Sequence, residues 1–336
     1  MRNIIVFFSI VLLVSAREVS AGDTVTFCAA GDVLLDRGCG AKIRQHGFDY
    51  LFESVRDFVQ SSDLAICNLE GPMSAKKRTS VENMRFCADS AYVEVLKRSG
   101  FDIFCLANNH ILDYGRQALL ETRNILEKNG LAALGAGKNK SEAASARLIQ
   151  KNGYTFAFLS FAAVPYFGAG LNADFPCPAI ADSATVRAEV EKCRPTADYV
   201  IVTFHWGVEY AARPAQEQVQ LAHLCIDSGA DLVIGHHPHV IQSIEKYRGK
   251  FILYSLGNFV FDQHKPEQRE SILFACTFRE GKVESPHIVP VIIPDRMYRP
   301  ELAGCTDSIR ITDRIKALSE GFAAVFRDGD TEIFLE

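Results

Sequence analysis

The sequence has no long run of basic residues, and its 336 residues carry a formal net charge of −5 at pH 7. This charge balance gives no reason to expect a nucleic-acid partner. The ten cysteines include no Cys-x-x-Cys pair, so a structural zinc site is not indicated. There is also no internal repeat and no low-complexity tract. The length and the hydrophobic fraction of 48% are those of a globular protein with one large domain or two small ones.

The first 21 residues differ in character from the rest of the chain. Arg2 gives a positive start, the stretch 4–14 is apolar apart from Ser9, and small residues follow up to Ala21. This layout predicts a secretory signal peptide over residues 1–21. The apolar stretch is short for a transmembrane helix, which needs about 20 residues. The alternative is an uncleaved N-terminal membrane anchor, and either interpretation predicts a secreted or periplasmic location for the remainder.

All ten cysteines lie in the part predicted to be exported, where disulfides are permitted. Cys177 and Cys193 flank a loop and are the best candidates for a bridge. Four others lie in strand-like runs and are interpreted as buried free thiols: Cys28, Cys67, Cys105 and Cys276.

Helical patterns alternate with short β-branched and aromatic runs, which predicts an α/β fold with a largely parallel sheet. The predicted helices cover residues 50–60, 91–98, 116–129 and 214–228. The second half is richer in strands, at 154–161, 240–246, 251–256, 271–279 and 283–293, and we expect these to build a second, partly antiparallel sheet. The predicted fold is a two-sheet sandwich flanked by helices. The segment 165–178 is expected to be a long loop.

Six of the strand-like runs end at residues that can bind a metal or a phosphate. In open α/β sheets the carboxyl edge of the strands is where ligands bind, so these residues are expected to converge. Their side chains suit hard and borderline divalent cations. The six ends carry Asp32, then Asn68 with Glu70, Asn109 with His110, His205, the stretch 235–239, and Asn258.

Three imidazoles within four residues, His236, His237 and His239, favour metal binding over a packing role. If this stretch is extended, His237 and His239 point the same way. Asp32 is a candidate metal ligand, with the capping of a following turn as the alternative. Glu70 could bridge two cations.

Asn109 offers an amide oxygen to a metal, and its neighbour His110 is placed to protonate a leaving oxygen. Asp113 is near enough in sequence to orient that imidazole. The alternative for Asn108 and Asn109 is the N-cap of a helix starting near residue 112, which is compatible with the first interpretation.

Arg37 is a candidate clamp for a phosphate or carboxylate, with a surface ion pair as the alternative. Glu209 is a candidate hydrogen-bond partner for a ligating histidine. Three further residues are predicted to contact substrate or wall the site: Asn68, for which a turn is the alternative, Asn258, and the single tryptophan, Trp206.

The motifs GDVLLDR, NLEGP, NNHILDYG, HWGVEY, GHHPHVIQ and SLGNFVFD occur in this order between about residues 25 and 293. Their order resembles the poly-γ-glutamate capsule biosynthesis family known as CapA. That family is similar to calcineurin-like metallophosphoesterases, with two sheets sandwiched between helices in a four-layer αββα arrangement. The resemblance implies a CapA-like domain over residues 22–295, followed by a C-terminal extension over residues 296–336.

The resemblance implies that His110 is the catalytic histidine and that one or two divalent cations (Mn, Fe, Zn or Mg) are held by Asp32, Glu70, Asn109, His205, His237 and His239. The chain departs from typical phosphoesterases at Leu34, where a ligating histidine is usual, and at the stretched 235–239 motif, which leaves open which two imidazoles ligate.

Two functions follow as hypotheses. In the first, the protein is a metal-dependent hydrolase of an exported anionic substrate, cleaving a phosphoester or an amide of polyglutamate. In the second, it is an accessory subunit that binds the polymer and membrane synthase partners without cleaving anything. Resemblance indicates the pathway more securely than the reaction, because a fold does not fix a function.

Overall fold

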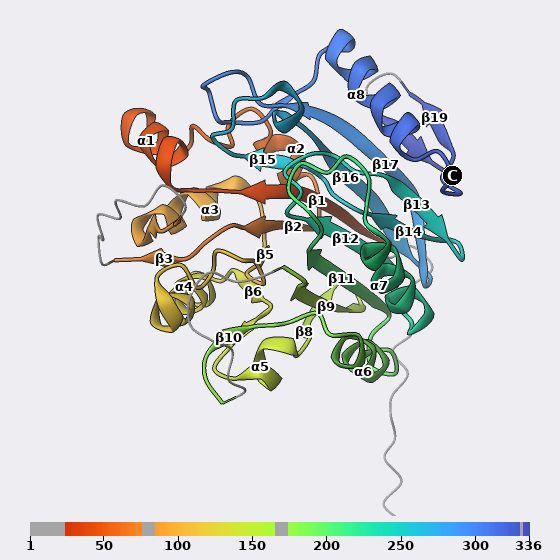
Figure 1. The fold of residues 1–336 in the computed structure, drawn as a ribbon, viewed down its shortest axis with the longest axis horizontal. Helices are drawn as coiled ribbons and strands as arrows, with labels where there is room; N and C mark the ends of the chain where they lie inside the picture. The colour runs from red at the N-terminus through yellow and green to blue at the C-terminus, as the bar shows by residue number, and fades with distance from the viewer. Residues whose placement is uncertain (1–23, 76–84, 165–173, 330–331) are drawn as a thin grey trace, which may run out of the picture.

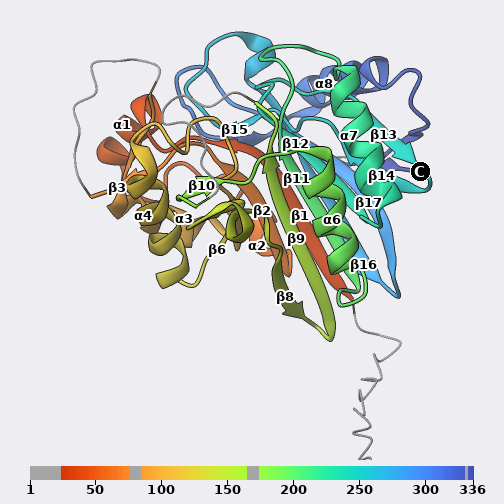
Figure 2. The same cartoon turned by 60° about the horizontal axis from the view of Figure 1, so that its bottom comes forward.

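Two β-sheets pack face to face, with helices on both outer faces, in a computed structural model that describes residues 24–75, 85–164, 174–329 and 332–336. The predicted signal peptide at 1–21 and most of the predicted loop at 165–178 lie outside these residues. Figure 1 shows α1, α3 and α4 on one side of the strands and α6 and α7 on the other, and Figure 2 shows the same separation from a second angle.

The first sheet has a parallel half and an antiparallel half that meet at β1 (Val25–Val33). The parallel half continues through β2 (Leu64–Leu69), β5 (Ile103–Cys105) and β6 (Ala132–Leu134). The antiparallel half runs through β16 (Glu270–Arg279), β17 (Lys282–Ile292), β20 (Ile333–Leu335) and β19 (Phe326–Asp328). Two short strands lie off this path: β15 (Asn258–Val260) pairs with β1, and β18 (Glu301–Leu302) pairs with β17.

The second sheet has a parallel centre with antiparallel edges. Its order is β13 (Ile244–Tyr247), β14 (Lys250–Leu253), β12 (Leu232–His236), β11 (Tyr199–His205), β9 (Tyr154–Ala162) and β8 (Arg147–Lys151). Two further two-stranded pairs join β3 (Met73–Ser74) to β4 (Ala88–Asp89) and β7 (Ala136–Gly137) to β10 (Cys177–Pro178).

The helices divide between the two outer faces. The helices beside the first sheet are α1 (Arg37–His46), α2 (Arg56–Gln60), α3 (Val93–Ser99) and α4 (Gly115–Lys128), with the 3-10 turn η1 (Ser90–Tyr92) before α3. Those beside the second sheet are α5 (Lys140–Ala144), α6 (Ser183–Cys193) and α7 (Gln216–Asp227). The turn η2 (Pro266–Gln268) precedes β16, and α8 (Cys305–Leu318) packs beside β17.

Side-chain alternation along each central strand feeds two hydrophobic layers. In β11, Tyr199 and Ile201 point into the layer between the sheets, whereas Val200 and Val202 point into the layer beneath α6 and α7. All four side chains are fully buried. This period of two fixes which residues at the end of the strand face the other sheet.

The predicted two-sheet sandwich flanked by helices is confirmed, but the sheet membership of two predicted strands is wrong. β16 and β17 complete the first sheet, because the edge of β1 opposite β2 pairs with β16 instead of being left open. The predicted helix over 50–60 is also only partly formed: residues 48–55 make turns and only α2 is helical.

The proposed bridge between Cys177 and Cys193 is wrong, since both are free thiols, one in β10 and the other at the end of α6. Cys28, Cys67, Cys105 and Cys276 are buried and free, as predicted. Among the described residues, no helix combines the length and the apolar character needed to cross a bilayer.

Candidate metal centre

Strand register brings the polar residues at the strand ends together. Asp32 of β1 lies opposite Asn68 of β2 on one side and Asn258 of β15 on the other. His205 of β11 lies opposite His236 of β12 in the second sheet. The predicted convergence at one edge is therefore present, and it involves both sheets.

Two buried carboxylates occupy the centre of this cluster. Asn68 donates from its amide nitrogen to Oδ1 of Asp32 (2.8 Å) and to Oε2 of Glu70 (3.1 Å). The backbone N–H of His237 donates to Oδ2 of Asp32 (3.3 Å). Asn68 thus holds the two carboxylates side by side. This role differs from both the turn and the substrate contact that were considered for it from the sequence.

The second oxygen of Glu70, Oε1, is buried and has no hydrogen-bond partner among the described residues. It lies 3.8 Å from Nε2 of His239 and 3.9 Å from Nε2 of both His110 and His205. An unpaired buried carboxylate oxygen is costly, and three imidazole nitrogens at nearly equal distance surround the space in front of it.

Two further ligand atoms, from Asn109 and His237, lie near His205 at the separations expected around a cation. Nε2 of His205 is 2.9 Å from Oδ1 of Asn109 and 3.1 Å from Nδ1 of His237. Nitrogen and oxygen ligands bind a divalent cation at about 2.1 Å, so two ligands at a right angle are about 3 Å apart and two nearly opposite ligands about 4 Å apart. The residues present therefore fit a divalent cation, and the groups that could hold one include Asp32 with Glu70 and His239.

Burial and neighbouring charge set the ionisation of the cluster. Burial and the charge of Asp32 raise the pKa of Glu70 to about 7. Burial alone would lower the pKa of His239, but the charge of Glu70 and the hydrogen bond to Asp32 raise it to about 9. Burial and the nearby His239 lower the pKa of His237 to about 3, so this imidazole is neutral at pH 7. His239 carries a proton at pH 7 without a metal and would release it on binding a cation.

His110 has the surroundings predicted for a proton donor. Its Nδ1–H donates to Oδ2 of Asp113 (2.8 Å), which also accepts from the backbone N–H of Phe86 (2.7 Å). The ring of Phe86 stacks on the imidazole with centroids 4.0 Å apart. Asp113 thus orients His110 as predicted, and the other nitrogen, Nε2, faces Glu70.

Arg37 is exposed and paired with Asp262, whose two oxygens accept from Nε at 3.1 Å. Its guanidinium lies 4.8 Å from the centre of the Phe86 ring, on which His110 also stacks. The surface ion pair weighed as an alternative is therefore formed. The ion pair also holds the guanidinium against Phe86, the ring that contacts the candidate proton donor His110.

The three imidazoles of the 236–239 stretch take different roles. His236 donates from Nε2 to the backbone carbonyl of Ala30 (3.2 Å) and so serves the backbone. His237 and His239 direct their rings into the cluster, although the stretch is not extended as predicted. Both have left-handed backbones, with φ of 96° and 58°, and the intervening Pro238 separates them.

Two residues predicted to contact substrate, Asn258 and Trp206, have protein partners in the structure. Asn258 accepts at Oδ1 from Nδ1 of His239 (2.9 Å) and donates to the carbonyl of Gln268 (2.9 Å), so it orients a histidine. Trp206 lies in the core beneath α6 and α7, stacks on Phe204 and donates to the carbonyl of Tyr254 (2.8 Å). Strand alternation explains this, because Trp206 and His205 point to opposite faces.

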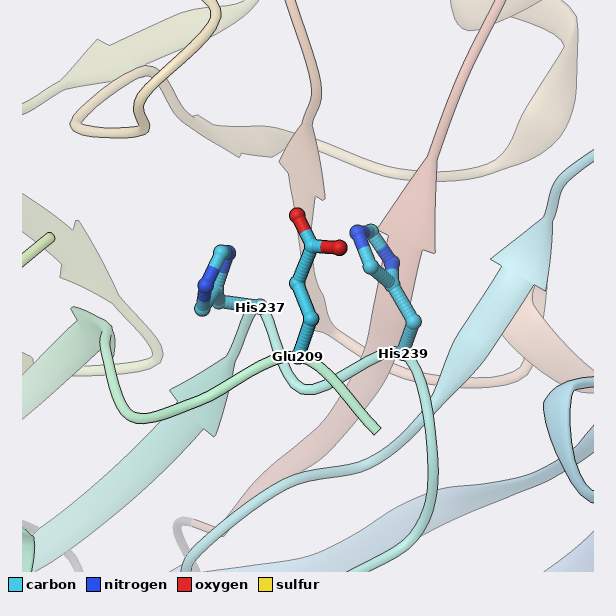
Figure 3. Close-up of side chains that lie close together, drawn as sticks. All are labelled: Glu209, His237 and His239. Carbon is cyan, nitrogen blue, oxygen red and sulfur yellow. The ribbon is translucent and has the colours of Figure 1, made fainter. Parts of the chain in front are cut away.

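Sequence reasoning missed Phe86 and Asp262, and it gave Glu209 only a hydrogen bond to a ligating histidine. Phe86 stands in no recognisable motif. Asp262 is the last residue of the motif SLGNFVFD, and this position in a motif could have indicated a role in the site. Glu209 lies in the motif HWGVEY, and its carboxylate points into the space between His237 and His239 (Figure 3). The alternative of Asn108 and Asn109 as the N-cap of a helix starting near residue 112 is not observed, since α4 begins at Gly115 with Tyr114 as its N-cap.

Comparison with known proteins gives one family and several relatives. The bacterial capsule synthesis protein family PGA_cap matches residues 26–263. The chain is 30% identical over 322 residues to the capsule biosynthesis protein CapA of Bacillus anthracis, covering 93% of this chain and 78% of that protein. It is 33% identical over 312 residues to the PGA biosynthesis protein CapA of Bacillus subtilis strain 168, covering 91% and 81%.

Among solved structures, a hypothetical protein from Thermus thermophilus aligns with a TM-score of 0.52 at 17% identity, over 80% of this chain and 100% of that one. Identity at this level shows a common fold and nothing further. The segment matched by the family contains every residue predicted for the site.

Proposed function

Because the chain belongs to the bacterial capsule synthesis protein family, we propose that it is an exported, metal-dependent hydrolase-like protein of capsule or poly-γ-glutamate biosynthesis. Its substrate would be a phosphoester or a bond within an anionic polymer. The observation that carries this proposal is the unpaired Oε1 of Glu70, which three imidazole nitrogens surround at 3.8–3.9 Å.

A cation would be held by side chains from both sheets: Asp32, Glu70, Asn109, His205, His237 and His239. When bound, a divalent cation supplies Lewis acidity and lowers the pKa of water toward about 7. The donor set of carboxylate, amide and imidazole suits one or two ions of Mn, Fe, Zn or Mg.

The chain's own residues supply the proton and the anion contact. Asp113 fixes the proton of His110 on Nδ1, so Nε2 is the atom that delivers a proton to a leaving oxygen once the ring is protonated. Asp262 holds the guanidinium of Arg37 against the ring of Phe86, on which His110 also stacks. A guanidinium in this place stabilises the negative charge of a phosphate or carboxylate.

Replacement of His110 tests the catalytic proposal. In His110→Ala, turnover of a generic aryl phosphoester with Mn²⁺ should fall by about 10²–10⁴-fold, the usual contribution of a general acid, while bound Mn²⁺ stays near the wild-type amount. His46→Ala removes an exposed imidazole at the end of α1 and should leave both quantities unchanged. Equal turnover by His110→Ala and the wild type would contradict the assignment.

A second candidate function is a binding subunit that holds the polymer and membrane synthase partners. One observation favours it: Leu34, in the position where typical phosphoesterases carry a ligating histidine, is fully buried against Phe86 and Phe261. A wild-type protein that binds Mn²⁺ yet turns over no phosphoester with any divalent cation would favour this function over the hydrolase.

A further inference from the structure

A second group of metal-binding side chains lies beside the buried cluster. Glu209, His237 and His239 each offer one ligand atom, and these atoms lie within 4.8 Å of one another. The two imidazoles are buried, whereas Glu209 is exposed. Figure 3 shows the carboxylate of Glu209 between the two rings, reaching there from a separate loop.

The backbone holds this loop against the histidine stretch. The N–H of Tyr210, the residue after Glu209, donates to the carbonyl of Pro238 (2.8 Å), the residue between the two histidines. Tyr210, His237 and His239 all have positive φ, at 65°, 96° and 58°. Non-glycine residues adopt this conformation at a cost in free energy, and such positions cluster at ligand sites.

His239 belongs to both candidate groups, since its ligand atoms are also close to Asp32 and Glu70. The inner group is wholly buried, and the outer group ends at an exposed carboxylate. The two groups therefore form one continuous set of donors that runs from the interior of the sandwich to solvent.

We propose that Glu209 is a metal ligand which, together with His237 and His239, holds a divalent cation at the solvent-facing end of this centre. The inference rests on the proposed cation centre and adds a ligand from outside the sandwich. An ion pair with His239 alone would also bring a carboxylate here. For the ion pair, the carboxylate needs to be close only to His239, whereas a ligand must be close to both His239 and His237. A shorter acidic side chain therefore distinguishes the ion pair from the ligand role.

Mn²⁺ uptake, measured by equilibrium dialysis with elemental analysis, tests the inference. Glu209→Gln should bind the last Mn²⁺ taken up at least about tenfold more weakly than the wild type. Glu209→Asp keeps the negative charge on a side chain that is shorter by one methylene. If Glu209 is a ligand, this variant should bind the last Mn²⁺ more weakly than the wild type and more tightly than Glu209→Gln. Glu217→Gln, which removes another exposed acid on α7, should bind as the wild type does.

The outcomes separate this inference from the proposed function. If Glu70→Gln loses Mn²⁺ while Glu209→Gln binds it as the wild type does, the role of Glu209 is overturned and the centre stands. If Glu209→Asp matches the wild type, Glu209 acts only through its charge and the ligand role is overturned. If the wild type takes up no divalent cation, both proposals fail. Glu209→Gln should melt at the wild-type temperature without metal, because the side chain is exposed.

Discussion

Glu70 shows at the residue scale how a binding site costs stability when nothing is bound. Its carboxylate is buried beside that of Asp32, and one oxygen has no hydrogen-bond partner among the described residues. A buried polar group without a partner costs about 1–3 kcal/mol, and more when it is charged. A cation in front of that oxygen would replace the cost with a favourable interaction.

Glu70→Gln should therefore stabilise the metal-free protein and abolish its stabilisation by metal. The amide keeps the shape of the side chain but removes a buried charge next to Asp32, so we expect a gain of about 1–3 kcal/mol in the free energy of unfolding with EDTA present. Mn²⁺ should then raise the melting temperature of the wild type only. Thermal unfolding with EDTA and with Mn²⁺ measures both effects.

Glu217→Gln provides the control, because it removes an exposed acid and should leave both melting curves unchanged. A metal-free Glu70→Gln protein that melts below the wild type would show that the carboxylate stabilises the fold by itself, contrary to this account.

Much of the site is predictable from residues alone, for a physical reason. Asp32, Glu70 and His205 stand at or just after the ends of buried strands, and register brings such ends together whatever the details of packing. Side-chain direction is harder to predict. Trp206 follows a site histidine in sequence yet faces the opposite layer, because one residue along a strand reverses the face.

At the scale of elements, the approach of β1 to the segment before β15 positions two site residues. A Cβ atom added at Gly31 would lie 1.9 Å from the carbonyl oxygen of Gly257. The backbone N–H of Asp32 donates to that same carbonyl (3.1 Å). Glycine at position 31 is therefore required for the register in which Asp32 lies opposite Asn258.

Gly31→Ala should push the two segments apart and disturb the metal centre with the fold. We expect a loss of about 1–3 kcal/mol in the free energy of unfolding, as for overpacking in a core, together with weaker Mn²⁺ binding. Gly304→Ala is a matched control, since a Cβ there meets nothing within 4 Å. Urea unfolding and Mn²⁺ dialysis measure the two effects, and an unperturbed Gly31→Ala variant would contradict the proposed close approach.

Element type is better predicted than element partner. The strands at 271–279 and 283–293 and the turn between them follow from local pattern, and β16 and β17 pair with each other as expected. Their membership of the first sheet depends on which edge of β1 is free to pair with another strand. The local sequence of β16 and β17 does not indicate this. The apolar spacing over 50–60 fits a helix, but only its second half forms one. Tyr50, Leu51 and Val55 lie in turns and are buried there, so their apolar side chains do not require a helix.

At the scale of the whole molecule, the segment after residue 295 shares the core of the sandwich. Ile311 and Ile315 of α8 and Ile333 and Leu335 of β20 belong to the hydrophobic layer between the two sheets. Arg314 also binds Glu270 at the start of β16 (2.8 Å). A segment with such contacts is expected to unfold together with the sheets and not before them.

Ile311→Ala tests whether the molecule unfolds as one unit. Ile311 is 0% exposed, whereas Ile309 on the same helix is 63% exposed, so the two truncations differ only in burial. Ile311→Ala should lower the free energy of unfolding by about 2–5 kcal/mol, and Ile309→Ala should change it by less than about 0.5 kcal/mol.

The single tryptophan, Trp206, lies in the other hydrophobic layer, beneath α6 and α7, so its fluorescence reports on the second sheet. If the sandwich and its C-terminal segment unfold together, the fluorescence transition in urea shifts by the same amount as the transition in far-UV circular dichroism. A fluorescence transition that stays in place while α8 melts early would mean that residues 296–336 fold as a separate extension.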